Sequence, residues 1–304
     1  MFALKRKLRN YKFYDYYNVI TFKMAIQDIS TYSFKDVFSL SVVSFEKACV
    51  LNKPEQIDAY TIFWIKDGKG TYNIDFEKYS FDGNVLFFLS PGQVFSVNSE
   101  KIKEAYRINF VKDFYCIQTH DKEVACNGVL FNNVYETPFV SPCKKDTAKL
   151  NFILENLIEE FSNSETAQYD MLQTYLKQFI ILAVRIQKEN HEIKENSESK
   201  LFKDFSVLVE MNFKKMHSVT SYANRLGVSP KSLTKNFQKI GTNTPSDFIK
   251  NRIILEAKRQ ILYSTDTVKQ IAFNLGFNDP AYFSRFFTKA TSKSPLQFKK
   301  EFNQ

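Results

Sequence analysis

The 304-residue chain is poor in the residues that build cross-links and metal centres, with only 4 cysteines and 3 histidines. The cysteines lack the C-x-x-C spacing of zinc and redox sites, and the histidines have no ligand spacing with them, with carboxylates or with one another. These residues are Cys49, Cys116, Cys126, Cys143, His120, His191 and His217. We therefore expect reduced thiols, no disulfide framework, no metal and no cofactor.

Long hydrophobic runs are also missing. No stretch approaches the roughly 20 apolar residues that cross a bilayer. The basic residues 1–13 have no apolar segment behind them, so they do not read as a signal peptide. These absences argue against membrane insertion and export, and we expect a cytoplasmic location.

Aromatic and basic residues are plentiful, and the basic ones are unevenly placed. Apolar residues make up 44% of the chain and Phe occurs 31 times, which indicates a globular protein of about two domains. Residues 201–304 hold 17 Lys and Arg against 7 Asp and Glu, a net of +10, whereas the preceding 200 residues have a net of −1. A neutral domain joined to a basic one suggests a separately controlled module that binds a polyanion.

Two amphipathic patterns and a polar stretch precede the basic region. Apolar residues recur at spacings of three and four in 147–161 and in 168–187, which predicts a helical hairpin. Such helices pair either with a second subunit, giving a homodimer through 147–187, or with their own domain, and the pattern leaves both open. Residues 188–200 read KENHEIKENSESK, and this polar composition at the change of charge predicts an interdomain linker.

Residues 24–140 show the pattern of a β domain. Short β-branched and aromatic runs at 62–65, 71–76, 85–89 and 94–97 alternate with turn-forming residues. The expected turns are DGKG at 67–70, DGN at 82–84 and SPGQ at 90–93. Strands of about five residues separated by such turns predict an antiparallel sheet or a small barrel.

The predicted fold is therefore α+β, with an N-terminal antiparallel β-barrel and a helical hairpin joined to an all-α C-terminal domain. The predicted segments are a basic tail at 1–23, expected to be disordered, the β domain at 24–140, the helical segment at 141–190, the linker at 191–200 and the all-α domain at 201–304. The tail is either an accessory arm or a stretch ahead of a natural start at Met24, and both readings stay open.

The region after the linker contains an internal duplication. SVTSYANRLGVSPKSLTKNF at 218–237 aligns with TVKQIAFNLGFNDPAYFSRFF at 267–287. Ala223 and Ala272 are 49 residues apart, as are Gly227 and Gly276, and the second copy has one extra residue after the glycine. A duplication with one insertion is far more specific than a single motif.

Each copy carries the pattern of a helix, a tight turn and a second helix. A Ser, Thr or Asp stands at each expected N-cap, a glycine ends the first helix, and a proline follows the second cap. The expected caps are Ser218, Ser229, Thr267 and Asp279. Gln270, three residues after Thr267, completes a capping box. The sequence thus predicts two helix-turn-helix units.

The second helix of each unit has an apolar and a polar face. We expect Leu233, Phe237 and Ile240 to point inward in the first unit, and Phe283, Phe287 and Ala290 in the second. The outward residues can reach base edges or phosphates in a major groove. They are Lys231, Thr234, Lys235, Gln238, Ala281, Ser284, Arg285, Thr288 and Lys289. Lys235 and Arg285 are the best candidates for contacts with DNA. The alternative is that they are solvent-exposed charges on ordinary helices, and the duplication and the net charge argue against it.

One continuous helical pattern at 248–263 joins the two units. At 1.5 Å per residue it would hold them roughly 24 Å apart. Two units on one rigid connection can enter successive major grooves of double-stranded DNA, and bending of the DNA helps both to engage.

Residues 201–304 resemble the DNA-binding domain of the AraC/XylS family of bacterial regulators. The resemblance rests on both units, on NRIILEAKRQIL at 251–262, on IAFNLGFNDPAYFSRFFTKATSKSPLQF at 271–298, and on TPSDF at 244–248, which SPLQF echoes. Ser292 departs from the family, which usually has glycine at the end of that helix, so we expect a left-handed serine. The resemblance implies sequence-specific DNA binding, transcription regulation and contact with RNA polymerase.

The front part resembles the cupin-like sensor domain of such regulators through GKGTYNID at 68–75 and VLFFLSPGQVF at 85–95. Histidine, the metal ligand of metal-binding cupins, is absent from 60–110, and Phe95 stands where related sequences often have it. The resemblance implies a small-molecule effector pocket or its vestige, without metal or catalysis. Trp64, Tyr72 and Phe95 are candidates to line it, although core packing is the favoured role of each.

Three readings of the whole chain remain. The first, which we favour, is a DNA-binding regulator that responds to a small-molecule effector. The second is a regulator or architectural DNA binder whose front domain mediates only protein contacts. The third is a cupin-type enzyme, and the lack of a His, Cys and carboxylate constellation argues against it, so we expect no enzymatic activity.

Overall fold

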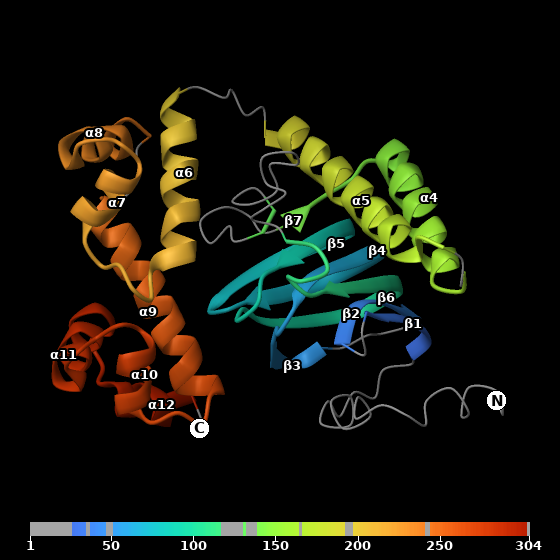
Figure 1. Ribbon diagram of the computed structural model, residues 1–304. Helices are drawn as coiled ribbons and strands as arrows, with labels where there is room; N and C mark the ends of the chain where they lie inside the picture. Colours follow the sequence, from blue (N-terminus) through green and yellow to red (C-terminus); the bar gives the residue numbers. More distant parts are fainter. Residues whose placement is uncertain are drawn as a thin grey trace.

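A β-rich front part and an all-helical back part lie side by side in the chain (Figure 1). The computed structural model describes residues 26–34, 37–46, 51–116, 130–131, 139–163, 166–191, 197–240 and 244–302. The predicted basic tail at 1–23 lies outside these residues. The predicted α+β class is confirmed.

The front part is built on one antiparallel sheet. Its strands are β1 (Ile26–Phe34), β2 (Val37–Glu46), β3 (Leu51–Gln56), β4 (Tyr60–Ile74), β5 (Glu77–Leu89), β6 (Val94–Phe110) and β7 (Phe139–Val140). They follow the order β1-β2-β6-β4-β5-β7, with β3 also on β6. Because β1 and β7, the two ends of this path, are not paired with each other, the sheet is open over the described residues. The predicted antiparallel strands are confirmed, and they form the sheet and not the barrel.

Strands β4 and β5 form one long hairpin, which corrects two of the predicted turns. The expected turns at 67–70 and 82–84 lie opposite each other inside the hairpin, next to a shift of register, and the chain reverses instead at 75–76. Gly70 serves close strand packing, because an added Cβ there would lie 2.4 Å from a backbone oxygen of β6. The turn predicted at 90–93 is confirmed.

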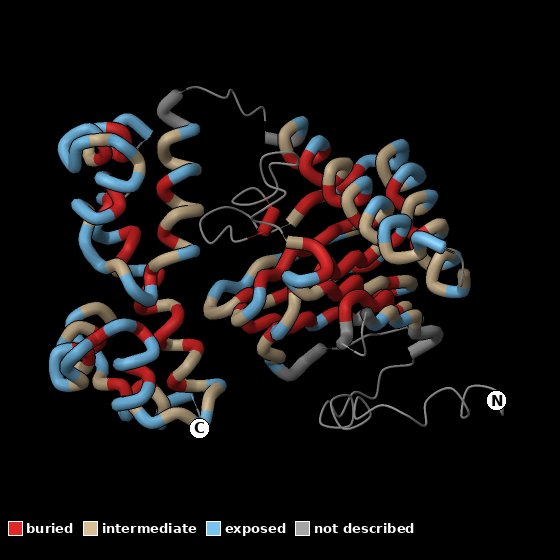
Figure 2. The backbone as a smooth tube through the Cα atoms, viewed as in Figure 1, coloured by how far each residue is buried: buried red, intermediate tan, exposed pale blue. Residues whose placement is uncertain are grey.

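Helices α4 (Lys144–Glu160) and α5 (Gln168–His191) cover one face of the sheet (Figure 1). Their apolar stripes are buried against strands β4, β5 and β6, as the burial colours show (Figure 2). The stripes comprise Leu150, Leu154, Leu157, Leu172, Leu176, Phe179, Ile180 and Ala183. The hairpin thus packs on its own domain, and a homodimer through 147–187, which stays a prediction, would use other faces of these helices.

The back part contains α6 (Ser197–Asn212), α7 (Val219–Arg225), α8 (Pro230–Ile240), α9 (Pro245–Tyr263), α10 (Val268–Asn274), α11 (Pro280–Thr291) and α12 (Pro295–Phe302). A single phenylalanine-rich core runs through all of them. Helices α5 and α6 extend into the predicted linker from both sides, because Lys and Glu are good helix formers even where they are fully solvated. What remains between them, 192–196, lies outside the described residues.

None of the helices in the described ranges is long and apolar enough to cross a membrane.

Phe179 anchors α5 on the sheet, with its ring centroid 5.8 Å from that of Trp64. We predict that Phe179→Ala lowers the free energy of unfolding by about 3–5 kcal/mol, because it leaves a cavity in a closed core. Phe152→Ala on α4 removes the same ring from a side chain that is 68% exposed, and should cost about 0.5 kcal/mol or less. Urea unfolding followed by circular dichroism measures both, and equal midpoints would contradict this packing.

Candidate nucleic-acid interface

The predicted caps are present in both helix-turn-helix units. The Ser218 and Ser229 side chains accept hydrogen bonds from backbone N–H groups three residues ahead, each at 3.1 Å. Thr267 and Gln270 form the reciprocal capping box. Asp279 accepts from two backbone N–H groups in the first turn of α11, at 2.8 and 3.1 Å. Each unit therefore starts its helices where the sequence predicts.

Glycine ends the first helix of each unit, and the two glycines have different surroundings. Gly227 has a φ of +67° with open space around it. Gly276 has a φ of +79°, and an added Cβ would lie 2.2 Å from the backbone oxygen of Lys214. Nearby, a His217 ring nitrogen lies 2.9 Å from the Leu275 carbonyl oxygen. The turn of the second unit thus packs on the loop that leads into the first, which fixes the two units against each other.

Helix α8 presents a polar face to solvent. Leu233 and Phe237 are buried as predicted, whereas Ile240 is 37% exposed at the helix end, where the core no longer covers it. Lys231, Lys235 and Gln238 are exposed. Thr234 is half-buried, and its hydroxyl donates to the Pro230 carbonyl oxygen at 2.9 Å.

Helix α11 repeats this arrangement. Phe283 and Phe287 are buried, and Ala290 is half-buried against the core. Ala281, Arg285, Thr288 and Lys289 are exposed, and Ser284 is half-buried. The sequence prediction missed Tyr282, which is 56% exposed among them. Its position directly before the buried Phe283 on a helix was the available indication.

Ser292 ends α11 in the left-handed conformation, with a φ of +60°. Its N–H donates to the Thr288 carbonyl oxygen at 2.8 Å. The expected left-handed serine is therefore confirmed, and the helix ends without the glycine that such a position favours.

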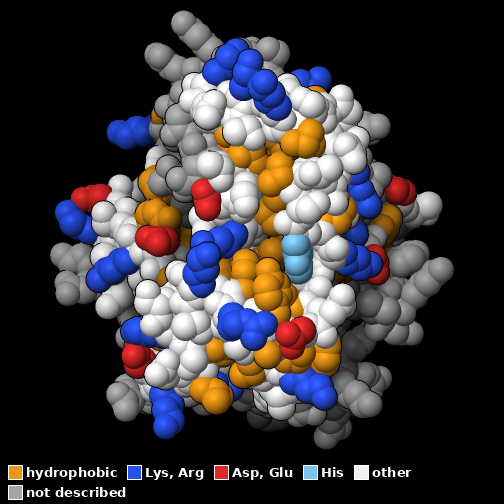
Figure 3. Space-filling model, turned by 90° about the vertical axis from the view of Figure 1, so that its left-hand side faces the viewer, with side chains coloured by type: hydrophobic (Ala, Val, Ile, Leu, Met, Phe, Trp, Pro, Cys, Tyr) orange, Lys and Arg blue, Asp and Glu red, His pale blue; other side chains and the backbone are white. Residues whose placement is uncertain are grey.

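Helices α8 and α11 lie on the side of the molecule that faces away from the sheet (Figure 1). Viewed from that side, Lys and Arg side chains are spread over the surface, with fewer Asp and Glu among them (Figure 3). The exposed Arg285 is 3.7 Å from Asp279, and both side chains are more than half exposed. Such a surface pair is weak and can exchange its partner for a nucleic acid.

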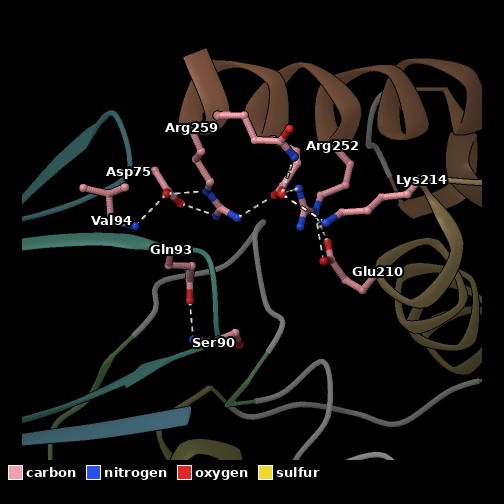
Figure 4. Close-up of polar contacts among 10 residues, drawn as sticks. Asp75, Ser90, Gln93, Val94, Glu210, Lys214, Arg252 and Arg259 are labelled. Atoms are coloured by element: carbon pink, nitrogen blue, oxygen red, sulfur yellow. Dashed lines mark hydrogen bonds and ion pairs between the residues drawn. The ribbon is translucent and has the colours of Figure 1, made fainter. Parts of the chain in front are cut away.

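Helix α9, which joins the units, buries charged side chains. The Arg252 Nε donates to both carboxylate oxygens of Glu210 on α6, at 2.7 and 2.8 Å. Glu256 accepts from Arg252 at 3.3 Å and from Arg259 at 3.4 Å. Figure 4 shows Arg252, Glu210 and Lys214 converging on one side of this cluster, and Arg259 reaching Asp75 on the other.

The sequence prediction missed this cluster. Arg252 and Arg259 are seven residues apart with Glu256 between them, so the three share one face of α9. That spacing was visible, but it also fits a solvated helix face. Only the packed structure places them in the interior, with the Arg259 side chain 3% exposed.

The three predicted pocket residues are buried in two different clusters. Trp64 packs under α5, and its Nε1 donates to Asn84 at 2.7 Å. Tyr72 and Phe95 lie in the cluster on the other face of the sheet. They do not share one site, and their role in ligand binding stays a prediction.

The described residues contain no group of three or more His, Cys, Asp or Glu side chains arranged to hold a metal ion.

The two turn glycines give a matched test of how the units are joined. Gly227→Ala should lower the free energy of unfolding by about 1 kcal/mol, the cost of a left-handed non-glycine residue. Gly276→Ala should cost clearly more, because its methyl group also meets the Lys214 carbonyl. Thermal unfolding of both variants measures the difference. Equal losses would show that the second turn is not packed on the loop before the first unit.

Glu256 gives a prediction about pH. Burial by itself would raise the pKa of Glu256, but Arg252, Arg259 and Lys214 lower it from 4.5 to about 2. Because the folded pKa is depressed, the ionised carboxylate stabilises the fold above pH 4.5, and this contribution is lost as the pH falls toward 2. The stability difference between the protein and Glu256→Gln should therefore shrink across this window. A difference that is constant with pH in chemical denaturation would contradict it.

Comparison with known proteins finds sequence similarity mainly in the helical back part. Residues 222–301 match a family described as helix-turn-helix domain. An HTH-type transcriptional regulator from the 5′ region of cgkA in Pseudoalteromonas carrageenovora is 35% identical over 98 residues, which cover 31% of this chain and 56% of that protein. Histidine kinase P4 of Formosa agariphila is 25% identical over 107 residues, which cover 35% of this chain and 8% of that protein. The matches thus span about half or less of these relatives.

The structure of ToxT from Vibrio cholerae aligns with 86% of this chain and 97% of its own, at 17% identity and a TM-score of 0.40. The sequence matches and the two units described above agree with the resemblance drawn from the motifs. Residues 222–301 therefore form a helix-turn-helix domain, and this domain is similar to those of transcriptional regulators of the HTH type.

Proposed function

We propose that this protein regulates transcription by inserting α8 and α11 into successive major grooves of double-stranded DNA. The observation that carries the proposal is the pair of capped helices that lie on the same side of the molecule (Figure 1), each with exposed polar residues. Helix α9 has 19 residues and spans about 28 Å at 1.5 Å per residue. This is close to the roughly 34 Å between major grooves on one face of DNA.

The exposed side chains divide into two roles in this proposal. Arg285 and Lys235 are exposed on their helices and contact base edges in this proposal, where an arginine can donate two hydrogen bonds to a guanine. The hydroxyls of Thr234, Ser284 and Thr288 donate to carbonyl oxygens of their own helices. We assign these residues, with Lys231, Gln238, Ala281 and Lys289, to the surface that approaches the backbone and groove floor.

We propose that the front part senses a small-molecule effector. Its support is the Tyr72 hydroxyl, which is buried and has no hydrogen-bond partner among the described residues. Such a group costs about 1–3 kcal/mol when unsatisfied, and an effector with an acceptor oxygen would satisfy it. A front part used only for protein contacts is the alternative. Thermal-shift screening of metabolites separates the two, because only a sensor is stabilised by a bound effector.

Four further proposals remain, of which the contact with RNA polymerase follows from the resemblance to the AraC/XylS regulators and the others from the sequence patterns. They are contact with RNA polymerase, a homodimer through 147–187, a cytoplasmic location and the absence of enzymatic activity. Each of these proposals concerns the whole protein, and the proposed role of helices α8 and α11 in DNA binding does not depend on any of them.

The test of DNA binding has two steps. DNA sequences that bind the protein are first selected from a pool of random duplexes, and the affinity for them is then measured by fluorescence anisotropy. We predict that Arg285→Ala weakens binding to the selected site by about 1–3 kcal/mol and relaxes the preference at one base pair. Lys103→Ala removes the same charge from an exposed position on β6 and should leave affinity unchanged. If Arg285 contacts only phosphate, affinity falls equally for all sequences. A full-length protein without salt-sensitive DNA binding would refute the function itself.

A further inference from the structure

The front and back parts meet at the β4–β5 turn. The Arg259 guanidinium on α9 donates two hydrogen bonds to the Asp75 carboxylate, from Nε at 2.7 Å and from Nη2 at 2.6 Å. The side chains are 3% and 7% exposed. Two-point pairing of this kind is the strongest arginine–carboxylate geometry, and here it joins residues 184 positions apart in the sequence.

Asp75 is held in place from its own side of the interface. Its φ is +57°, a left-handed conformation that aspartate tolerates better than most residues. Its N–H donates to the Val94 carbonyl oxygen at 2.7 Å, and its carboxylate accepts from the Val94 N–H at 3.1 Å. The turn between β4 and β5 is therefore fixed to β6 (Figure 4). A shift within these three strands moves Asp75 relative to α9.

Phe76, the next residue, extends the contact to the last helix. Its ring centroid lies 6.2 Å from that of Phe298 and 5.9 Å from that of Phe302, both on α12. The Lys258 Nζ of α9 lies 5.1 Å from the same ring. One turn of the front part thus touches both the connecting helix and the final helix of the second unit.

Asp75 also completes the charges of the buried cluster on α9. The cluster has three bases and three acids: Lys214, Arg252, Arg259, Asp75, Glu210 and Glu256. Without Asp75 it has three bases for two acids. Removing one partner of a buried pair leaves an uncompensated charge, so the back part loses electrostatic compensation when the two parts separate, unless water enters.

The contact leaves the DNA-binding surface open. Asp75 and Phe76 approach α9 and α12 from the side of the sheet, whereas α8 and α11 face the opposite way (Figure 1). The contacts between the two parts include an ion pair, a ring contact and a lysine over an aromatic ring, and water can hydrate the charged groups when the two parts separate. The contact therefore does not block DNA by steric cover.

We propose that the Asp75–Arg259 ion pair is a latch through which the front part positions α9, so that the latched arrangement is the one that binds DNA. This rests on the proposed DNA-binding function and adds the route by which the front part controls it. Asp75 is a positioning residue in this scheme, because it acts on DNA only through α9. An effector that moves β4, β5 or β6 would close or release the latch.

The test uses the full chain with Asp75→Asn, Arg259→Lys and the double variant. Asparagine keeps the left-handed turn and an acceptor for Val94 but removes the charge, and lysine keeps the charge but not the two-point contact. The matched control is Asp82→Asn, which removes the same charge from an exposed residue of the same hairpin. Small-angle scattering measures the radius of gyration, and fluorescence anisotropy measures affinity for the selected DNA and for random DNA.

Each latch variant should increase the radius of gyration and weaken binding to the selected DNA by about fivefold or more, the usual lower end of coupling between sites. The double variant should be no weaker than the worse single variant, because both act on one contact. Random DNA should be bound as before, since the exposed charges remain. Asp82→Asn should match the unmodified protein.

The latch is overturned if Asp75→Asn stays compact and binds the selected DNA normally, or if the two single effects simply add. It is also overturned if both kinds of DNA are bound less well without any change in the radius of gyration, which would indicate an effect on the DNA-binding surface that does not involve separation of the two parts. If the unmodified protein binds no DNA, the proposed function fails, whereas the scattering data still report whether Asp75 holds the two parts together.

Discussion

The burial of helix α9 is the constraint on which the back part depends. This helix supplies core residues to both helix-turn-helix units, so it is covered on several sides (Figure 2). Its buried residues include Arg252, Glu256 and Arg259. Unpaired, such charges would cost several kcal/mol each, and they are tolerated only because each meets an opposite charge at hydrogen-bond distance. The position of the two units is therefore tied to electrostatic pairing as well as to apolar packing.

The pairing reaches in two directions from α9. Toward the first unit, Arg252 binds Glu210 on α6 and lies over the Phe213 ring. Toward the front part, Arg259 binds Asp75. Glu256 lies between the two arginines and is kept ionised by them. One chain of contacts thus runs from a β-turn through the connecting helix to the first helix of the back part, which gives a physical route from one domain to the other.

The front part is organised differently, because its two hydrophobic clusters are accompanied by buried polar residues that carry no charge, such as Ser41, Thr61 and Asn109. One cluster lies between the sheet and helices α4 and α5, and the other lies on the opposite face of the sheet. Strand alternation decides which residue enters which cluster, so neighbours such as Phe63 and Trp64 end on opposite faces. The polar Asp75 sits where the longest hairpin ends, outside both clusters and free to meet another domain.

Local chemistry in the sequence determined the helix-turn-helix units almost completely. Caps, glycines and prolines act within a few residues, so Thr267 with Gln270, Asp279 and Gly276 could be assigned without tertiary information. The same local rules failed at 67–70 and 82–84, where glycines serve a register shift and close strand packing in place of turns. How far two paired strands extend depends on the strands that pack beside them, and the composition of a segment does not reveal those neighbours.

Only the tertiary structure decided which charges are buried and which residues meet across the domains. The sequence shows that Arg259 is basic and lies on a helix, and it shows that Asp75 follows a β-branched and aromatic run. The sequence cannot show that the Arg259 Nη2 lies 2.6 Å from an Asp75 carboxylate oxygen, because the two residues are separated by 184 positions. Long-range pairing is set by how sheet and helices pack, and that packing is a property of the whole fold. The sequence by itself determined the helices offered to DNA, and the fold decided what holds them in place.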